Sequence, residues 1–392
     1  MQHLDLTTHW KQPGTIAQYA TGVSLHSHTS CSVETLDFVE AACAWVPGFR
    51  SALELYSREG SKRGMPLALD RANWRPPLQP RMAFGLEASQ IAALGLAPLV
   101  SLTDHDSMEA PLALRTLPSS RHIPMSTEWS APFGQTVFHL GIHNLPSRDA
   151  TLWMARFAAY TADAQRARTA SQSTEDLDRR LLSMLRELHA IPQALVVLNH
   201  PAWDLHRVGA TLHMNEVRRF LGAARSAIHA LELNGLRHAQ ENRGVARLAR
   251  ELGYLLISGG DRHGLEPNAN INLTSAHTFT EFVEELRVDR VSHVHFLNQY
   301  CKPWEQRILA STLDAITDFP HFMPGWQKWD ERVFHPDANG EMRPASELWP
   351  RGKAPLGLRL LVAAVRLGRM RVMSRPLSLA FPGVNRMEVE SF

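Results

Sequence analysis

The sequence predicts an α/β fold, because short apolar segments alternate with stretches of helical periodicity along most of the chain. Residues with metal-binding side chains stand where several of these apolar segments end. In parallel α/β barrels and in doubly wound sheets, chemistry collects at the carboxyl ends of the strands. The two observations together favour an α/β enzyme with a metal site at one end of its strands.

The composition excludes several other classes of protein. A formal charge of +2 over 392 residues gives no electrostatic footprint for extended nucleic acid. Three cysteines form no disulfide framework, and the first residues lack the basic and apolar regions of a signal peptide, so we expect a cytoplasmic protein. The chain contains no apolar run of about 18 residues, so we expect no transmembrane helix.

The periodicity of apolar residues divides the first 290 residues into elements. Residues 1–18 are polar and are expected to form an irregular arm before the domain at residues 19–290. Residues 47–81 are rich in proline, arginine and tryptophan and predict an insertion, either a lid over the substrate or a solvated loop. The expected helices span residues 33–46, 82–94, 152–189 with a break near 171–173, 214–224 and 240–252, and the expected strands span 19–23, 96–102, 122–126, 136–142, 194–199, 230–234 and 255–258.

Residues 291–392 predict a helical, irregular C-terminal extension. A helix over residues 304–316 is followed by a connector rich in proline and tryptophan. Residues 356–373 then form a basic, mostly apolar helix. Such a helix packs on the domain, forms a contact between subunits of an oligomer, or lies on an anionic membrane surface.

The pair His26 and His28 is the first of the metal-binding residues. Side chains on a strand repeat with period two, so both imidazoles point to one side and can bind one ion together. The residues at later strand ends make the set too rich for one ion, and we expect two or three. The whole set is His26, His28, His105, Glu128, His139, His200, Asp261 and His263.

In their order along the chain, these motifs resemble those of the PHP (polymerase and histidinol phosphatase) superfamily. The matching segments are His26-Ser-His28, Thr103-Asp-His105, Thr127-Glu128, His139-Leu-Gly141, Asn199-His200-Pro201 and Gly260-Asp261-Arg-His263, between about residues 20 and 290. The resemblance implies a distorted (β/α)7 barrel with a trinuclear site for Mn, Zn, Fe or Mg. It also implies hydrolysis of phosphoesters.

The resemblance further distributes the ligands among three ions. His26, His28, Glu128 and Asp261 would hold the first, His105 with Glu128 the second, and His139, His200 and His263 the third. The family commonly places an Asp or His shortly after the first pair of histidines, where this chain has Cys31, Ser32 and Glu34. Glu34 is our choice for that ligand, because a carboxylate suits a hard ion, while a Cys31 thiolate or water are the alternatives.

Three further residues are candidates for catalysis. Asp104 could orient an imidazole, protonate the leaving group, or only cap a loop. Arg262 could bind a phosphate through its guanidinium, although period two would point it away from Asp261 and His263. Arg207, shortly after His200, could also reach the substrate.

These features predict a metal-dependent phosphatase that acts on a small phosphorylated metabolite or nucleotide. A hydroxide held between the ions would attack the phosphorus in line, while an arginine neutralises the equatorial oxygens. Two alternatives remain open. One is a phosphodiesterase or nuclease acting on nucleic-acid ends, and the other is a non-catalytic metal-binding module that docks to a membrane or to a partner.

Overall fold

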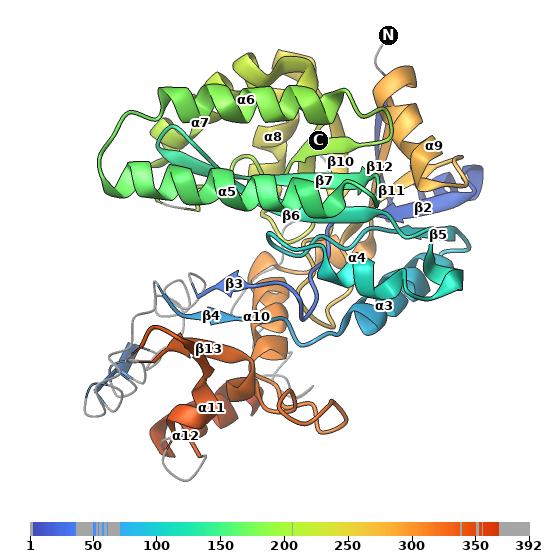
Figure 1. Cartoon of the computed structure of the whole chain (residues 1–392). Coiled ribbons are helices and arrows are strands. Elements are labelled where there is room, and N and C mark those ends of the chain that lie inside the picture. The colour runs from blue at the N-terminus through green and yellow to red at the C-terminus, as the bar shows by residue number, and fades with distance from the viewer. Residues whose placement is uncertain are drawn as a thin grey trace.

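The structure is a computed structural model, which describes residues 3–36, 50, 51, 54, 57, 58, 61, 71–205, 207–337, 339–349, 353–354 and 356–367. Most of the predicted helix over residues 33–46, most of the 47–81 insertion and residues 368–373 of the last predicted helix lie outside this part. The predicted α/β class is confirmed, since helices alternate with strands of three sheets (Figure 1).

The first sheet contains five strands in the order β1-β12-β11-β2-β5. Its two parallel pairs are β1 with β12 and β2 with β5, whereas β11 runs antiparallel to both of its neighbours. Residues expected as an irregular arm thus contain a strand, β1, which pairs beyond residue 290 with β12. The strands are β1 (His3–Thr8), β2 (Thr21–Ser24), β5 (Ala97–Val100), β11 (Asn270–Thr274) and β12 (Val291–Phe296).

The second sheet also contains five strands, in the order β10-β9-β8-β7-β6. The three strands β8, β9 and β10 are parallel and buried along their whole length, as expected where both faces of a sheet are covered. The β6–β7 hairpin is antiparallel, and so is the β7–β8 pair, so this sheet is mixed. The strands are β6 (Met125–Phe133), β7 (Thr136–Leu145), β8 (Leu195–Leu198), β9 (Ala230–Asn234) and β10 (Leu255–Gly259).

A third, small sheet joins parts of the chain that lie far apart in sequence. Its order is β14 (Met342–Pro344), β13 (Val333–Pro336), β4 (Asn73–Trp74) and β3 (Glu34–Thr35), with antiparallel pairing throughout. The start of the predicted helix at residue 33 is therefore a strand. The C-terminal extension is helical only in part, because β13 and β14 belong to this sheet.

Most predicted helices are confirmed within a few residues at each end. The break predicted near residues 171–173 separates α5 from α6, and Ser171 takes a left-handed φ of 51° there. Gly253, with a φ of 77°, ends α8 in the left-handed conformation that a glycine adopts without strain. The helices are α3 (Pro80–Ala92), α4 (Glu109–Leu114), α5 (Ala150–Thr169), α6 (Glu175–His189), α7 (Ala210–Ala224), α8 (Ala239–Leu252), α9 (Phe279–Glu284), α10 (Trp304–Ala315), α11 (Ala345–Leu348) and α12 (Leu356–Leu367).

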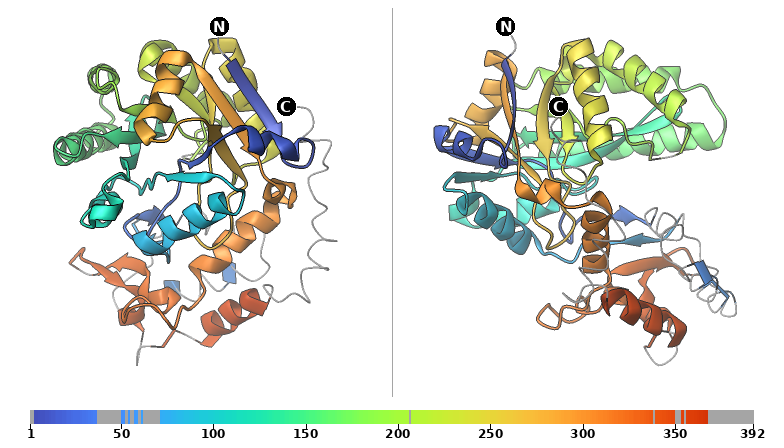
Figure 2. Two further views of the ribbon diagram at one scale, coloured as in Figure 1. Left: turned by 90° about the vertical axis from the view of Figure 1, so that its right-hand side faces the viewer. Right: turned by 180° about the vertical axis from the view of Figure 1, so that it is seen from behind.

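Helices flank the large sheets on more than one side, since α3 and α4 lie below β5 in Figure 1, and the C-terminal elements form a separate lobe below the sheets. Helices α5 and α6 lie over β6 and β7, while α10, α11, α12 and β13 gather with β3 and β4 (Figures 1 and 2). Within this lobe, Arg366 of α12 donates to the Ile316 carbonyl and pairs with Asp318 at 2.9 Å. Among the described residues, no helix is long and apolar enough to cross a membrane.

The two large sheets meet at the ends of their strands. Within the described residues, neither sheet closes on itself as a barrel. Two isolated parallel bridges join them, one between Ser27 and Arg262 and one between His105 and Glu128. The first links the segment after β2 to the segment after β10, and the second links the segment after β5 to β6. All four residues are predicted ligands or neighbours of predicted ligands.

Candidate metal centre

Strand ends and the β6–β7 hairpin together bring the predicted ligands to one place. His26 and His28 follow β2, His105 follows β5, and Asp261 and His263 follow β10. Glu128 and His139 lie on the β6–β7 hairpin, and His200 follows β8. His200 and Asp261 take positive φ angles of 28° and 52°, so the chain turns sharply where these strands end.

A first group of ligand atoms forms around His26. Its Nε2 atom lies 3.0 Å from Nε2 of His28 and 3.0 Å from Oε2 of Glu128. Oδ1 of Asp261 lies 3.7 Å from the same atom and 3.5 Å from Nε2 of His28. These four residues are the set expected for the first ion, and all four are buried.

A second group forms around Glu34, the residue chosen over Cys31. Its Oε1 atom lies 3.4 Å from Nδ1 of His28, and its Oε2 atom lies 3.4 Å from Nε2 of both His105 and His263. Ser32 donates to Glu34 and accepts the backbone N–H of His105, which fixes this corner. The structure therefore places Glu34 among the candidate ligands.

A third group lies on the other side of Glu128. Nδ1 of His139 and Nε2 of His200 are 3.3 Å apart, and they lie 3.4 Å and 3.2 Å from Oε1 of Glu128. Nε2 of His105 lies 3.4 Å from Oε2 of the same carboxylate. His263, expected with His139 and His200, instead lies with Glu34 and His28. Glu128 thus stands between the groups.

The donor atoms fit a bound cation. Nδ1 of His26 lies 2.6 Å from Oε1 of Glu232 and donates to it, so a neutral His26 turns its Nε2 lone pair toward His28 and Glu128. Lone pairs that face one another at 3.0 Å require a proton or a metal ion between them. His105 adds a buried Nδ1 that has no hydrogen-bond partner among the described residues. Imidazoles mixed with carboxylates accept several divalent ions.

The electrostatics divide the candidate ligands. Against the effect of burial, the neighbouring carboxylates raise the pKa of His26, of His139 and, to about 9, of His263, so a metal ion at these imidazoles would have to displace a proton. Burial lowers the pKa of His28, His105 and His200, which favours the neutral imidazole that binds metal. Burial would raise the pKa of Glu128, but the surrounding imidazoles, His26 first among them, hold it well below its ordinary value. The carboxylate of Glu128 is therefore ionised.

The described residues include three groups of three residues whose ligand atoms converge. They are His26, His28 and Glu128; His28, Glu34 and His263; and His105, Glu128 and His139.

Two buried residues that orient the ligands were missed in the sequence. Glu232 accepts from His26 and from the backbone N–H of His200 at 2.8 Å, so it supports two candidate ligands at once. Asn199 donates to Oε1 of Glu128 at 2.9 Å. Glu232 could have been noticed in the sequence as a carboxylate inside the apolar segment that forms β9, because a buried charge requires a partner.

The three predicted catalytic residues have different surroundings. Both oxygens of Asp104 accept from Thr29, from its N–H at 2.5 Å and its hydroxyl at 2.8 Å, so this carboxylate shapes the loop after His28. Burial raises the pKa of Asp104 to about 7. Arg207 is exposed, and its contact with a substrate stays a prediction.

Arg262 does not point into the site. Its Nε donates to the Gly264 carbonyl at 2.9 Å, and NH1 lies 3.2 Å from Glu87, with only 5% of the residue exposed. The predicted contact between Arg262 and a phosphate is therefore corrected, because period two turns this side chain to the face opposite Asp261 and His263.

Arg237 supplies positive charge beside the third group. Its guanidinium lies 3.7 Å from the ring centre of Trp203, whose ring lies 4.9 Å from that of His200. Nε of Arg237 is buried without a hydrogen bond among the described residues, although Glu241 lies 3.9 Å away. Arg237 also contributes to the lowered pKa of His200, after burial and the charge of His139.

Comparisons with known proteins give no assignment. No family model and no curated protein matches the sequence. An amidohydrolase from Chromobacterium violaceum, solved with bound sulfate and no metal, is similar over 59% of this chain and 92% of its own, with 17% identity and a TM-score of 0.33. A protein from Bifidobacterium adolescentis, provisionally described as a metal-dependent phosphoesterase, matches over 55% and 92%, with 16% identity and a TM-score of 0.32. Function is therefore argued from the site alone.

Proposed function

We propose that this chain is a metal-dependent phosphoesterase that hydrolyses a phosphomonoester of a small metabolite or nucleotide. One observation carries the proposal, namely that Glu128 is buried and ionised between groups of imidazoles on both of its oxygens. A carboxylate in this position can be shared by two ions. Two divalent ions about 3.5–4 Å apart stabilise the attacking and the leaving oxygen of a phosphoryl displacement.

The residues of the chain then have separate tasks. Glu232 keeps the Nδ1 proton of His26 in place, so that Nε2 remains a ligand. Arg237 and Trp203 border the His200 side of the centre, where a guanidinium would attract the dianionic phosphate of a monoester. The chain as a whole carries a formal charge of only +2, which favours a small substrate over a long nucleic acid.

The proposal includes a distorted seven-stranded barrel of the PHP type. Pairing runs from β2 to β5 and from β6 through β7, β8 and β9 to β10. The bridges between Ser27 and Arg262 and between His105 and Glu128 would complete the ring. Both bridges lie at the ligands, so closure of the ring and assembly of the metal centre would depend on the same residues.

The test is phosphate release from a panel of phosphomonoesters, nucleotides and one phosphodiester, by protein loaded with Mn. The matched pair is His105→Ala and His122→Ala, since His105 faces the groups around Glu128 and His122 is exposed. We expect release by the wild type and by His122→Ala, a loss of at least about 100-fold in His105→Ala, and loss with EDTA that Mn reverses.

Two outcomes would contradict the proposal. Full activity after complete removal of metal would exclude a metal-dependent mechanism. Stoichiometric metal without release from any monoester would favour the phosphodiesterase or the non-catalytic module instead, and the phosphodiester in the panel separates these two.

A further inference from the structure

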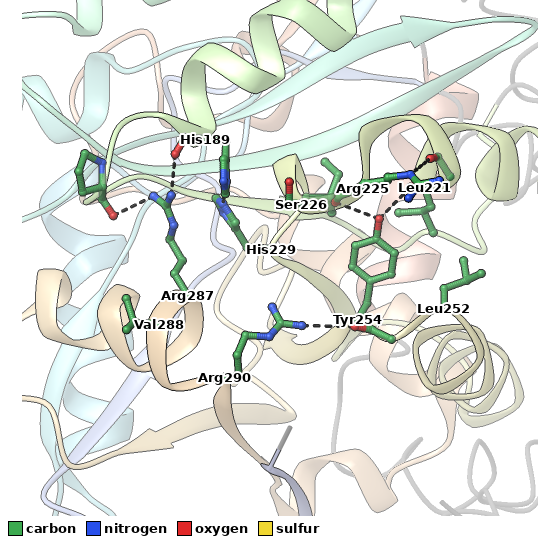
Figure 3. A pocket seen from close by; sticks show the side chains of 14 residues that line it. His189, Leu221, Arg225, Ser226, His229, Leu252, Tyr254, Arg287, Val288 and Arg290 are labelled. Carbon is green, nitrogen blue, oxygen red and sulfur yellow. Dashed lines mark hydrogen bonds between the residues drawn. The ribbon is translucent and has the colours of Figure 1, made fainter. Parts of the chain in front are cut away.

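A cavity of about 620 Å³ is drawn in Figure 3. It lies at the ends of the strands opposite to those that carry the candidate metal centre. Its walls come from the end of α6, the segment between α7 and β9, the turn between α8 and β10, and the segment before β12. These segments all precede strands, whereas His200, Asp261 and His263 follow strands. The volume is in the range of pockets for small molecules.

Three arginines from different segments line this cavity, and no aspartate or glutamate does. Arg287 is held rigidly, because it donates to the carbonyls of His189 at 2.6 Å and of Pro192 and Ala194 at 2.8 Å each. Arg225 donates through Nε to the Gly222 carbonyl at 3.2 Å. Within the described part of the chain, none of the three arginines forms an ion pair, so no carboxylate of that part neutralises their charge.

The third arginine, Arg290, stands on another side of the cavity from Arg287 (Figure 3). Its guanidinium donates from NH2 to the Gly253 carbonyl, and this hydrogen bond is long at 3.3 Å. Arg225 and Arg290 both take positive φ angles, 42° and 58°, in tight turns that lead into β9 and β12. The turns therefore hold two guanidiniums at the cavity instead of leaving them on helix surfaces.

A pair of histidines adds a directed donor. The backbone N–H of Val196 donates to Nδ1 of His229 at 2.8 Å, so the proton of a neutral His229 is on Nε2. That proton is donated to Nδ1 of His189, 3.0 Å away, which leaves the Nε2 proton of His189 available. Burial, followed by the charge of Arg287, lowers the pKa of His229 to about 2, and no carboxylate opposes the effect.

Apart from Ser226, the rest of the wall is mostly apolar. Leu221, Ile228 and Tyr254 line it, and Tyr254 turns its hydroxyl away to donate to the carbonyls of Leu221 and Arg225. The ring of Tyr254 thus offers a surface for stacking (Figure 3). Leu252 and Val288 lie among the lining residues with 39% and 69% of their surface exposed.

We propose that this cavity is a binding site for a small phosphorylated molecule that carries an aromatic or apolar group. Guanidiniums without protein carboxylates match the oxygens and the double charge of a phosphate, and the Tyr254 wall matches the organic part. The site is separate from the metal centre, and the proposal does not depend on the reaction proposed there.

The test is calorimetric titration of EDTA-treated protein with AMP and with pyrophosphate, since removal of metal suppresses binding of phosphate at the metal centre. The test variant is Arg225→Asn with Arg290→Asn, because asparagine tolerates a positive φ better than most residues. The control is Arg121→Asn with Arg148→Asn, which removes the same charge from exposed positions elsewhere.

We expect the wild type and the control to bind AMP equally, and the test variant to bind at least about tenfold more weakly, which corresponds to about 1.4 kcal/mol. Thermal unfolding of each variant checks that it is folded, and Arg225→Lys with Arg290→Lys, which keeps the charge, should restore part of the affinity. Binding by the wild type to neither probe, or equal binding by the wild type and the test variant, would overturn the proposal.

Discussion

Replacing Glu232 by glutamine tests whether the centre depends on a carboxylate that is not itself a ligand. Glu232 accepts three hydrogen bonds, from Nδ1 of His26 at 2.6 Å, from the N–H of His200 at 2.8 Å and from Nδ2 of Asn234 at 3.0 Å. Glutamine has nearly the same shape but only one acceptor oxygen. One side of its amide must therefore present N–H groups to a buried donor.

Either orientation of the amide damages the site. If the oxygen faces His26, the N–H of His200 and the amide of Asn234 lose their acceptor, which costs about 1–3 kcal/mol of folding free energy for each unsatisfied group. If the NH₂ group faces His26, the imidazole moves its proton to Nε2 and can no longer bind metal through that atom. Loss of such a supporting partner typically weakens metal affinity 10–100-fold, or about 1.4–2.7 kcal/mol.

The assay is competition for Mn and Zn between the protein and a fluorescent chelator, with urea unfolding of the same samples. Glu285→Gln is the matched control, because Glu285 also accepts a side-chain hydrogen bond, from Thr274, but lies at the other ends of the strands. We expect Glu232→Gln to lose affinity and Glu285→Gln to keep it. An affinity within twofold of wild type in Glu232→Gln, while His26→Ala loses binding, would refute the reasoning.

Two further predictions concern stability. Arg262→Met should lower the free energy of unfolding, measured in urea, by about 3–5 kcal/mol, because it leaves Glu87 as a buried charge without its ion-pair partner. The double variant Arg262→Met with Glu87→Met should recover most of that loss. If the single variant is as stable as wild type, the structural role of Arg262 is contradicted. Because His229 has a folded-state pKa of about 2, against 6.5 in a model compound, the unfolded chain binds more protons between these values. The free energy of unfolding should therefore fall as the pH drops below about 6.5, by about 1.4 kcal/mol per pH unit from this residue. In His229→Asn this decline between pH 6.5 and 5 should be shallower. An unchanged dependence of the unfolding free energy on pH would count against a neutral, buried His229.

Local patterns in the sequence were sufficient to predict most elements and to select candidate ligands that lie close together in the structure. The strands β8, β9 and β10 and the helix α8 were predicted to within one residue at each end, because apolar periodicity acts over short distances, whereas α7 begins at Ala210 instead of the predicted residue 214. The His26–His28 pair and the other strand-end residues were identified in the same way. Alignment of the carboxyl ends of β2, β5, β8 and β10 brings His26, His28, His105, His200, Asp261 and His263 together, whereas Glu128 and His139 join them from within the antiparallel β6–β7 hairpin.

Contacts between distant segments were decided only by the tertiary structure. Pairing of β3 and β4 with β13, the antiparallel β6–β7 hairpin, and the position of Glu232 behind His26 depend on how strands associate across the chain. Arg262 shows the same limit, since its partner Glu87 lies 175 residues away on α3. Periodicity fixes which face of a strand a side chain occupies, but the residue it meets on that face is set by the packing of the whole fold.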